Sequence, residues 1–340
     1  MKKVLIIATS RKTRGGITAV IKAHENGKQW KDYHCHWVQT HRDGPTWRKL
    51  AYLIWAFMDY LIRLPFYDII HVHMSLETTA KRKLPFVQIA KLLKKKIIIH
   101  LHCGTQIDDI WNYRYDYLFK SANIVLVLSE SLKKIVQKHV NVSNILTLYN
   151  PCPKPKLSMK ILNQKKILFS GTLYKGKGYA DLIRAFAEIA PKHPDWILSI
   201  AGNGEIEEGK QLATRLGISS QVEFLGWIKG DTKQQAFQEA SVFCLPSYAE
   251  GFPMAVLDAW AYGLPVITTP VGGIPDIAKD GDNMLLFTPG DVKTLATKLD
   301  CLINNEVLRK HIAAESIKLA QGPFSIDSIN SQLAQIYKSL

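Results

Sequence analysis

The sequence is poor in cysteine, with five among its 340 residues. They are Cys35, Cys103, Cys152, Cys244 and Cys301. Their odd number and wide spacing argue against a disulfide framework, and no two of them have the spacing of a zinc or thiol redox motif. This usage predicts a protein of the reducing cytoplasm.

Metal-binding patterns are also scarce. Histidines do come in two pairs at the ends of apolar strand-like runs, His71 with His73 and His100 with His102. Alternation along a strand puts both members of a pair on one face. No carboxylate or cysteine follows at ligand spacing, so we predict no metal and no other cofactor. We interpret His71 and His73 as packing or supporting groups.

Long hydrophobic runs are missing. The longest candidate, residues 50–58, is broken by Asp59 and is too short to span a bilayer. Residues 47–67 nevertheless mix aromatic and basic side chains, which is typical of a helix lying at a lipid interface. A core helix of the first domain is the alternative, and the sequence alone slightly favours it. Basic clusters at 81–83 and 94–96 support attachment to an anionic membrane surface.

Acidic residues are few in the first half of the chain. Residues 1–150 have 24 basic and 10 acidic side chains, a net of 24 − 10 = +14, whereas the remainder has 20 − 19 = +1. Such asymmetry predicts that the first half faces an anionic partner, either membrane lipid, nucleic acid or a phosphorylated acceptor. No nucleic-acid-binding module accompanies the charge, so we expect no nucleic-acid partner.

Short apolar runs alternate with helical stretches along the chain. The predicted strands are residues 4–8, 69–73, 97–101, 124–128, 166–169, 196–201, 222–225, 242–245 and 266–268. The first of these runs is too short for a secretory signal and is interpreted as a buried strand. Near-continuous Ile, Val and Leu predicts an α/β protein with parallel sheets covered on both faces. The proline-rich segment 149–156 is the natural linker, so we predict domains at 1–150 and 151–322, followed by a helix at 323–340.

Residues 246–258 form a predicted turn from a strand into a helix. Backbone amides at such a turn have no partner within the helix and face the positive end of its dipole, which favours phosphates. Phe252, Met254 and Ala255 can donate such amides, whereas Pro253 has no N–H and suits the first helical position. Glu250 and Asp258 add carboxylates at either end. The pattern predicts a long, polar, anionic ligand, although a plain strand-turn-helix crossover has the same form.

The segment EGFPMAVLD (250–258), followed by AWAYGLPVI (259–267), resembles the signature of retaining GT-B glycosyltransferases, in particular glycosyltransferase family 4. The likeness continues through VGGIPD (271–276) to Asp291, and it is strongest over residues 167–291. The resemblance implies two doubly wound, Rossmann-like domains that face each other across a cleft. It also implies a final helix, at 323–340, that packs back on the N-terminal domain.

The resemblance implies roles for individual residues. Glu250 would contact sugar hydroxyls near the reacting carbon, His102 would lie beside the transferred sugar, and Lys177 would reach the phosphates; these are the catalytic candidates. The donor site implied by the family comprises Gly16, Gly171, Lys175, Lys177, Ile228, Glu250, Gly251, Phe252, Pro253, Met254 and Asp258.

Two positions depart from the family pattern. Thr172 stands where the family usually has Arg, and Asp258 stands where it usually has Glu. Lys175 can replace the missing cation if its loop turns inward. The shorter Asp258 is expected to hold the ribose hydroxyls less firmly.

These features predict a retaining, metal-independent glycosyltransferase. It would move a sugar from a UDP-linked donor to a hydroxyl of a lipid-linked or oligosaccharide acceptor during surface polysaccharide synthesis. We expect it in the cytoplasm, peripheral on the inner face of the membrane. Two alternatives stay open: a sugar-nucleotide 2-epimerase of the same architecture, and a non-catalytic scaffold that binds nucleotide sugars.

Overall fold

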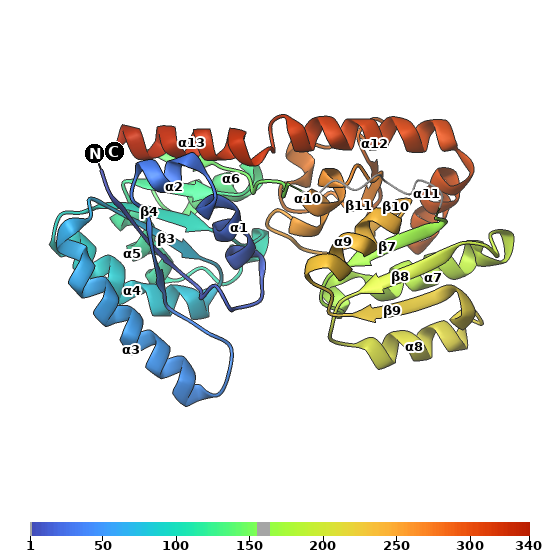
Figure 1. The fold of residues 1–340 in the computed structure, drawn as a ribbon, viewed down its shortest axis with the longest axis horizontal. Helices are drawn as coiled ribbons and strands as arrows, with labels where there is room; N and C mark the ends of the chain where they lie inside the picture. Colours follow the sequence, from blue (N-terminus) through green and yellow to red (C-terminus); the bar gives the residue numbers. More distant parts are fainter. Residues whose placement is uncertain (1, 155–163) are drawn as a thin grey trace. The chain divides into compact units, whose positions relative to one another are not determined.

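The computed structural model describes residues 2–154 and 164–340, which form two compact units (Figure 1). One unit comprises Met1–Pro151 together with Ile326–Leu340, and the other comprises Cys152–Ser325. None of the helices within the described ranges is long and apolar enough to cross a membrane.

The first unit is built on a six-stranded parallel sheet in the order β2-β1-β3-β4-β5-β6. Its strands are β1 (Val4–Ala8), β2 (His36–Gln39), β3 (Ile69–Met74), β4 (Lys96–Leu101), β5 (Ile124–Val127) and β6 (Ile145–Thr147). Its helices are α1 (Gly16–Glu25), α2 (Lys28–Asp32), α3 (Thr46–Arg63), α4 (Glu77–Leu92), α5 (Tyr113–Ser121), α6 (Glu130–His139) and α13 (Ile326–Ser339).

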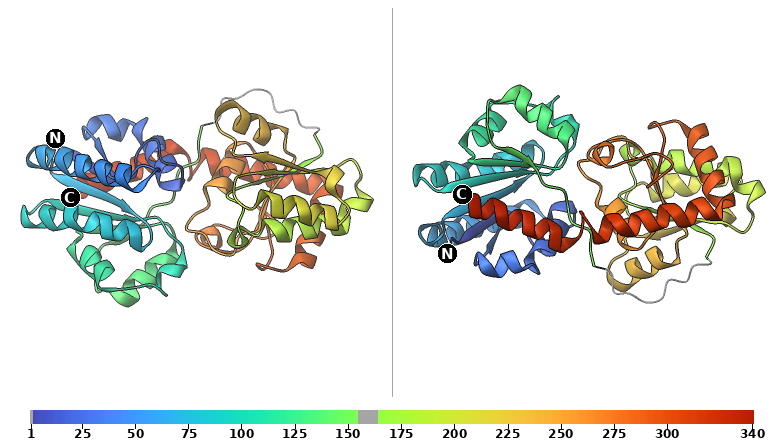
Figure 2. Two further views of the ribbon diagram at one scale, coloured as in Figure 1. Left: turned by 90° about the horizontal axis from the view of Figure 1, so that it is seen from below. Right: turned by 90° about the horizontal axis from the view of Figure 1, so that it is seen from above.

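Helices cover both faces of this sheet, because its strands are apolar on both sides. One face carries a core shared with α3, α4, α5 and α6, to which Tyr60, Phe86 and Phe119 contribute. The other carries a core shared with α1 and α13, to which Ile21, Leu333 and Tyr337 contribute. The C-terminal helix α13 lies beside α1 and α2 (Figure 2, right).

The second unit has another six-stranded parallel sheet, in the order β12-β11-β10-β7-β8-β9. Its strands are β7 (Lys166–Ser170), β8 (Ile197–Ala201), β9 (Val222–Gly226), β10 (Val242–Leu245), β11 (Val266–Thr268) and β12 (Leu285–Leu286). Its helices are α7 (Tyr179–Ile189), α8 (Ile206–Arg215), α9 (Gly230–Glu239), α10 (Met254–Ala261), α11 (Val292–Asn304) and α12 (Glu306–Gln321).

The predicted architecture of two doubly wound parallel sheets is confirmed, with three strands that the sequence did not predict. β2 mixes polar and apolar residues at one edge of its sheet, and β6 and β12 have only three and two residues at the other edges. Edge strands of this kind lack the long apolar run by which buried central strands are recognised. A smaller correction concerns Pro253. It is the N-cap residue of α10, just before the helix, and not the first helical residue.

Candidate functional site

The loops that carry the predicted donor residues leave neighbouring strands of the second unit. β7 and β10 lie side by side, and the strand order reverses between them, since the chain proceeds from β7 to β8 on one side and from β10 to β11 on the other. Ligands of open α/β sheets bind outside the carboxyl ends of the strands at such a switch point. Residues 171–178 and 246–253 therefore lie where a ligand is expected.

Close backbone contacts hold these two loops together. The amide of Tyr248 donates to the carbonyl of Gly176 at 2.9 Å. Gly178, with φ of +68°, ends the short helical turn η3 (Lys175–Lys177) and precedes α7. A Cβ on Gly178 would lie 2.0 Å from the carbonyl oxygen of Pro246. Only glycine accommodates both the left-handed conformation and this approach.

Lys177 and Glu250 meet at the centre of this arrangement. The Lys177 ammonium donates to Glu250 Oε1 at 2.5 Å, and the Ser247 hydroxyl donates to the same oxygen at 2.7 Å. The side chains of Lys177 and Glu250 are 21% and 11% exposed, so both are largely shielded yet reachable. The structure thus brings together two residues that are 73 positions apart and for which the resemblance implies phosphate and sugar contacts.

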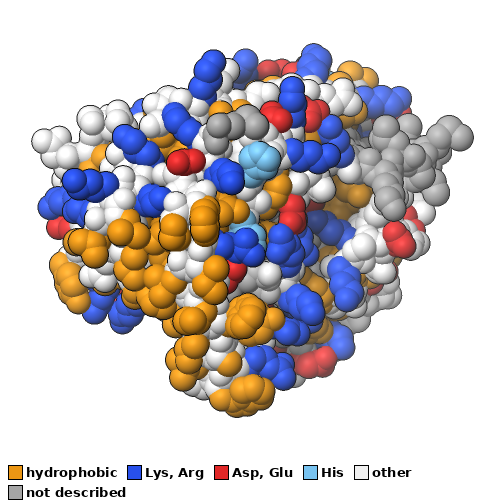
Figure 3. Space-filling model, turned by 60° about the vertical axis from the view of Figure 1, so that its left-hand side comes forward, with side chains coloured by type: hydrophobic (Ala, Val, Ile, Leu, Met, Phe, Trp, Pro, Cys, Tyr) orange, Lys and Arg blue, Asp and Glu red, His pale blue; other side chains and the backbone are white. Residues whose placement is uncertain are grey.

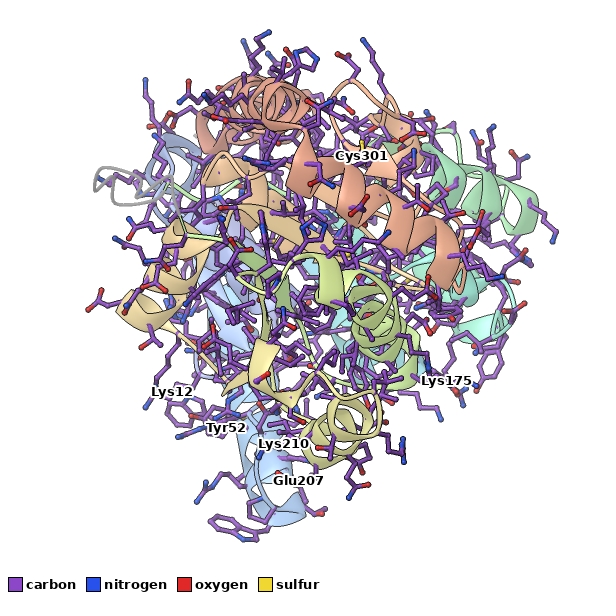
Figure 4. All side chains as sticks on the ribbon, turned by 90° about the vertical axis from the view of Figure 1, so that its right-hand side faces the viewer. Lys12, Tyr52, Lys175, Glu207, Lys210 and Cys301 are labelled. Atoms are coloured by element: carbon purple, nitrogen blue, oxygen red, sulfur yellow. The ribbon has the colours of Figure 1, made fainter. Side chains whose placement is uncertain are left out.

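The neighbouring cation Lys175 behaves differently. Its side chain lies at the surface of the second unit (Figure 4), and it makes no ion pair with any residue in the described ranges. Thr172 is exposed as well. The loop does not turn Lys175 inward, so the condition under which it would replace the family arginine is not met here.

The start of α10 presents backbone amides next to Glu250. The helix begins at Met254, and its first amides have no acceptor within the helix. Phe252 is buried against Trp260 and Phe324, with ring centroids 6.2 and 5.4 Å away, so its side chain anchors the turn. The Gly251 carbonyl accepts from the Gly273 amide at 2.8 Å. These contacts fix the turn in place, so the first amides of α10 keep the arrangement that favours anions at helix N-termini.

Asp258 lies within α10 and has a partner that the sequence did not reveal. The ammonium of Lys233, in α9, donates to Asp258 Oδ2 at 2.6 Å. Burial raises the pKa of the Asp258 carboxyl, and the Lys233 charge opposes that rise. Lys233 and Asp258 belong to separate helices with no motif between them, so only the fold pairs them. Asp258 therefore has one oxygen engaged before any ribose binds.

Gly171 and Ile228 mark the edges of the predicted donor site. The Gly171 amide donates to the Ala201 carbonyl at 2.9 Å, and the space beside its Cα is bounded by Phe169 and Lys177. Ile228 follows β9 and is partly buried. β9 lies two strands away from β7 in the sheet.

Gly16 and His102, the two predicted site residues of the first unit, follow β1 and β4. Gly16 opens α1 and is exposed, and Gly15 before it has φ of +137°. In this sheet the order reverses between β1 and β3, so the turn into α1 also lies at a switch point.

His102 is partly exposed, and its Nε2 lies 2.9 Å from Nδ1 of His73. Burial lowers the pKa of His102 to about 3, so its ring is neutral at physiological pH. One ring nitrogen from each of His71, His73 and His100 lies within 4.8 Å of the others. Ligand spacing along the sequence does not reveal this cluster, because strand pairing, not sequence spacing, assembles it.

The second unit therefore gathers Gly171, Lys177 and residues 250–254 around one switch point, whereas Lys175 points outward and Ile228 lies farther along the sheet. Gly16 and His102 occupy the corresponding edge of the first unit. The cleft between the domains stays a prediction.

Comparison with known proteins places these features in a family context. Residues 156–319 match the family model described as glycosyl transferases group 1. An uncharacterized glycosyltransferase of Haemophilus influenzae is 32% identical over 210 residues, which are 60% of this chain and 58% of that protein. The capsular polysaccharide biosynthesis glycosyltransferase CapM of Staphylococcus aureus is 26% identical over 274 residues, 74% of this chain and 72% of that protein. The chain thus spans little more than half the length of the Haemophilus relative.

Solved structures extend the likeness to the whole fold. Anabaena HepE in complex with UDP superimposes with a TM-score of 0.80 at 20% identity, covering 99% of this chain and 100% of that one. HepE has also been solved in complex with UDP-glucose. The chain therefore has the GT-B fold, and its residues 156–319 match the group 1 glycosyl transferase family.

Proposed function

We propose that the protein is a retaining, metal-independent glycosyltransferase that uses a UDP-linked sugar donor. The observation that carries this proposal is the Lys177–Glu250 pair at the β7/β10 switch point, beside the start of α10. The family match of residues 156–319 and the UDP-glucose complex of HepE support it. Retention and independence from metal are carried over from the resemblance to glycosyltransferase family 4.

In this proposal different residues of the second unit bind different parts of the donor. The diphosphate lies against the first amides of α10 and the Lys177 ammonium, which stabilise the negative charge that collects as the bond between sugar and phosphate breaks. Glu250 accepts hydrogen bonds from sugar hydroxyls, and Asp258 holds the ribose with its oxygen that Lys233 leaves available. The acceptor hydroxyl forms the new bond to the sugar, and its proton passes to the departing diphosphate.

A direct assay tests the activity. Purified protein is incubated with a panel of nucleotide sugars, with and without polyprenyl-pyrophosphate-linked glycans, and UDP release and product mass are followed. Acceptor-dependent release of UDP with a glycan heavier by one sugar is the expected result. An altered sugar nucleotide formed from donor alone would instead identify a 2-epimerase. Donor binding without any turnover would identify a scaffold.

The acceptor is proposed to be lipid-linked, in surface polysaccharide synthesis, because the first unit has a surface suited to a membrane. The large apolar residues along α3 and the following turn are exposed instead of buried (Figure 3). They are Trp47, Leu50, Ile54, Trp55, Met58, Leu61, Ile62 and Phe66, exposed by 39–74%. We call this set the α3 patch. The inner face of α3, with Ala56 and Tyr60, contributes to the core, so the prediction of a core helix is confirmed for that face alone.

Basic side chains border the α3 patch. The Arg48 guanidinium lies 5.4 Å from the ring of Trp47. At the other end, the Lys95 ammonium donates to the Pro65 carbonyl at 3.3 Å, which brings the end of α4, with its exposed Leu92, next to Phe66. An apolar stripe edged by cations fits the boundary between anionic headgroups and acyl chains. The name of CapM, which refers to capsular polysaccharide, agrees with such a role.

Sedimentation with vesicles tests the membrane surface. We expect the protein to bind vesicles rich in anionic lipid and to release them at high salt. The double variant Ile54→Glu, Trp55→Glu should bind at least about tenfold more weakly, because each substitution places a charge where an apolar group entered the bilayer. Val307→Glu is the control, since Val307 is 80% exposed on α12 of the second unit. Wild-type protein that stays in the supernatant, or equal binding by all three proteins, would contradict the proposal.

A further inference from the structure

Four histidines form a stack on one face of the first unit's sheet. His71 and His73 belong to β3, His100 belongs to β4, and His102 follows β4 directly. Strand register pairs His73 with His100. Ring centroids of neighbouring members are 4.1–5.5 Å apart. His71, His73 and His100 are at most 2% exposed, whereas His102 ends the stack at a position that a ligand can reach.

A metal ion is a poor explanation for the stack. Zinc binds imidazole nitrogens at about 2.0–2.1 Å, with the lone pairs directed at one point. The His71 ring lies 29° from the plane of His73 and 9° from that of His100, so their lone pairs run side by side. His71 Nδ1 is also engaged by the Tyr337 hydroxyl at 2.7 Å, and His73 Nδ1 by His102.

The contact between His73 and His102 is the one specific link within the stack. His73 Nδ1 and His102 Nε2, 2.9 Å apart, share one hydrogen. By contrast, neither nitrogen of His100 has a hydrogen-bond partner among the described residues. The His102 amide donates to the Met74 carbonyl at 2.7 Å, which fixes the backbone at this position. Backbone and ring of His102 are thus both held by the end of β3.

We propose that His73 is a positioning residue, which holds the His102 ring in one orientation and one tautomer. This inference rests on the proposed function together with the role that the resemblance implies for His102, beside the transferred sugar. A neutral imidazole carries a single hydrogen, so the role of one nitrogen determines the role of the other. If His102 Nε2 donates to His73, His102 Nδ1 is an acceptor; if Nε2 accepts, Nδ1 is a donor. In either case the bond to His73 determines whether the Nδ1 of His102 donates or accepts.

Two substitutions of His73 separate a hydrogen bond from mere packing. His73→Leu removes the partner of His102 and keeps an apolar group of similar size. His73→Asn keeps a donor or acceptor near the position of Nδ1, because the amide can present either atom. We expect His73→Leu to lower kcat by about 10- to 100-fold, by analogy with the loss seen when the group that orients a metal-binding histidine is removed. His73→Asn should recover most of that loss, and the affinity for UDP should stay unchanged in both.

His100→Leu is the matched control. It removes a ring from the same stack that has no hydrogen-bond partner, so kcat should stay within about twofold of wild type. Equal losses in His73→Leu and His100→Leu would show that packing of the stack matters and would overturn the proposal. So would wild-type activity in His73→Leu.

Nitrogen NMR of histidine-labelled protein tests the proposal without relying on activity. The His102 signals are assigned by their loss in His102→Gln. In wild type we expect one protonated and one bare nitrogen, the pattern of a single tautomer. In His73→Leu the two signals should move toward each other as the tautomers exchange, and in His73→Asn they should stay apart. Averaged signals in wild type would overturn the positioning role even if His73→Leu does not fold. A single tautomer in a protein without transferase activity would instead leave the positioning intact and contradict the proposed function.

Discussion

The two units use the same architecture and place different chemistry at the same location. Each begins with a strand, β1 or β7, whose carboxyl end leads through a glycine-containing loop into a helix at a switch point of the sheet. In the second unit this edge holds an ammonium and a carboxylate, Lys177 and Glu250, 2.5 Å apart. In the first unit the corresponding edge holds neutral histidines.

The two units also differ in how their charged groups are distributed. The second unit has a net charge near zero, yet it concentrates a cation and helix amides where a diphosphate would bind. The first unit has a large basic excess, but its switch-point edge is lined by uncharged rings, and the partly exposed cations Arg48 and Lys95 border the α3 patch. In the proposed function, the donor site therefore does not coincide with the unit of high net charge, but with the partly buried Lys177–Glu250 pair.

The largest difference that we expect between the two units is their loss of stability in acid. Burial lowers the pKa of all four stacked histidines, so they stay neutral in the folded state while the unfolded chain protonates them below about pH 6.5. Their contribution to stability is present above pH 6.5 and is lost as pH falls. Each such histidine costs about 1.4 kcal/mol per pH unit in that window. The first unit should therefore lose stability several-fold faster than the second between pH 6.5 and 5.

Hydrogen exchange, read separately from peptides of β3 and β4 and of β7 and β10, measures that difference. Asp258 in the second unit has the opposite effect on the pH dependence of stability. Because its pKa is raised, the folded state binds a proton at a higher pH than the unfolded chain does, which stabilises the second unit as the pH falls. His100→Leu should reduce the acid sensitivity of the first unit, and His311→Leu, at an exposed position of the second, should not. Equal protection of both units at pH 5 would contradict the account.

Removing the carboxylate of the second unit should have the next largest effect. We expect Glu250→Ala to lower kcat by about 100- to 1000-fold, because it deletes a fixed polar group next to the reacting sugar. Glu207→Ala, at an exposed position in α8, serves as the control for the assay. Transfer rates and the thermal midpoint of each variant are the measurements. Undiminished turnover of folded Glu250→Ala would exclude the proposed site.

The two lysines of the loop at 171–178 are expected to differ in their effect on UDP binding. Lys177→Ala should weaken UDP binding by about 10- to 100-fold, the effect of losing a charge-assisted hydrogen bond. Lys175→Ala should change it by less than about threefold, since that side chain is exposed. Dissociation constants follow from thermal midpoints measured over a range of UDP concentrations. Similar losses in both variants would mean that Lys175 does turn inward when the donor binds.

The smallest expected effect concerns the glycine that lets the two loops meet. Gly178 and Gly217 both have positive φ, +68° and +72°, but only Gly178 is crowded, whereas Gly217 has no atom within 4 Å of a built Cβ. Gly217→Ala should cost about 1 kcal/mol. Gly178→Ala should cost a further 1–3 kcal/mol, roughly, because the loop must move away from Pro246. Urea unfolding measures both, and equal costs would show that the loops are not in contact.

A feature could be predicted from the sequence when it depends on residues that are close together in the chain. The β7 and β10 strands and the turn at 246–258 are encoded by short apolar runs and turn residues next to each other, so their places were predictable. Glu250 and Lys177 were found by resemblance, but their mutual contact depends on β7 and β10 being neighbours in a sheet. Lys233 could not be predicted as the partner of Asp258, because no local pattern links α9 to α10. The histidine stack depends on parallel register, and the exposure of the α3 patch depends on which face of an amphipathic helix meets the core.

The location of the donor site can be measured most directly by hydrogen exchange of the wild-type protein with and without UDP-glucose. The account predicts slower exchange in peptides that cover residues 170–178 and 246–258 and no change in α11 and α12. Protection confined to other parts of the chain, or no protection with any nucleotide sugar, would contradict the central claim that the β7/β10 switch point binds the donor.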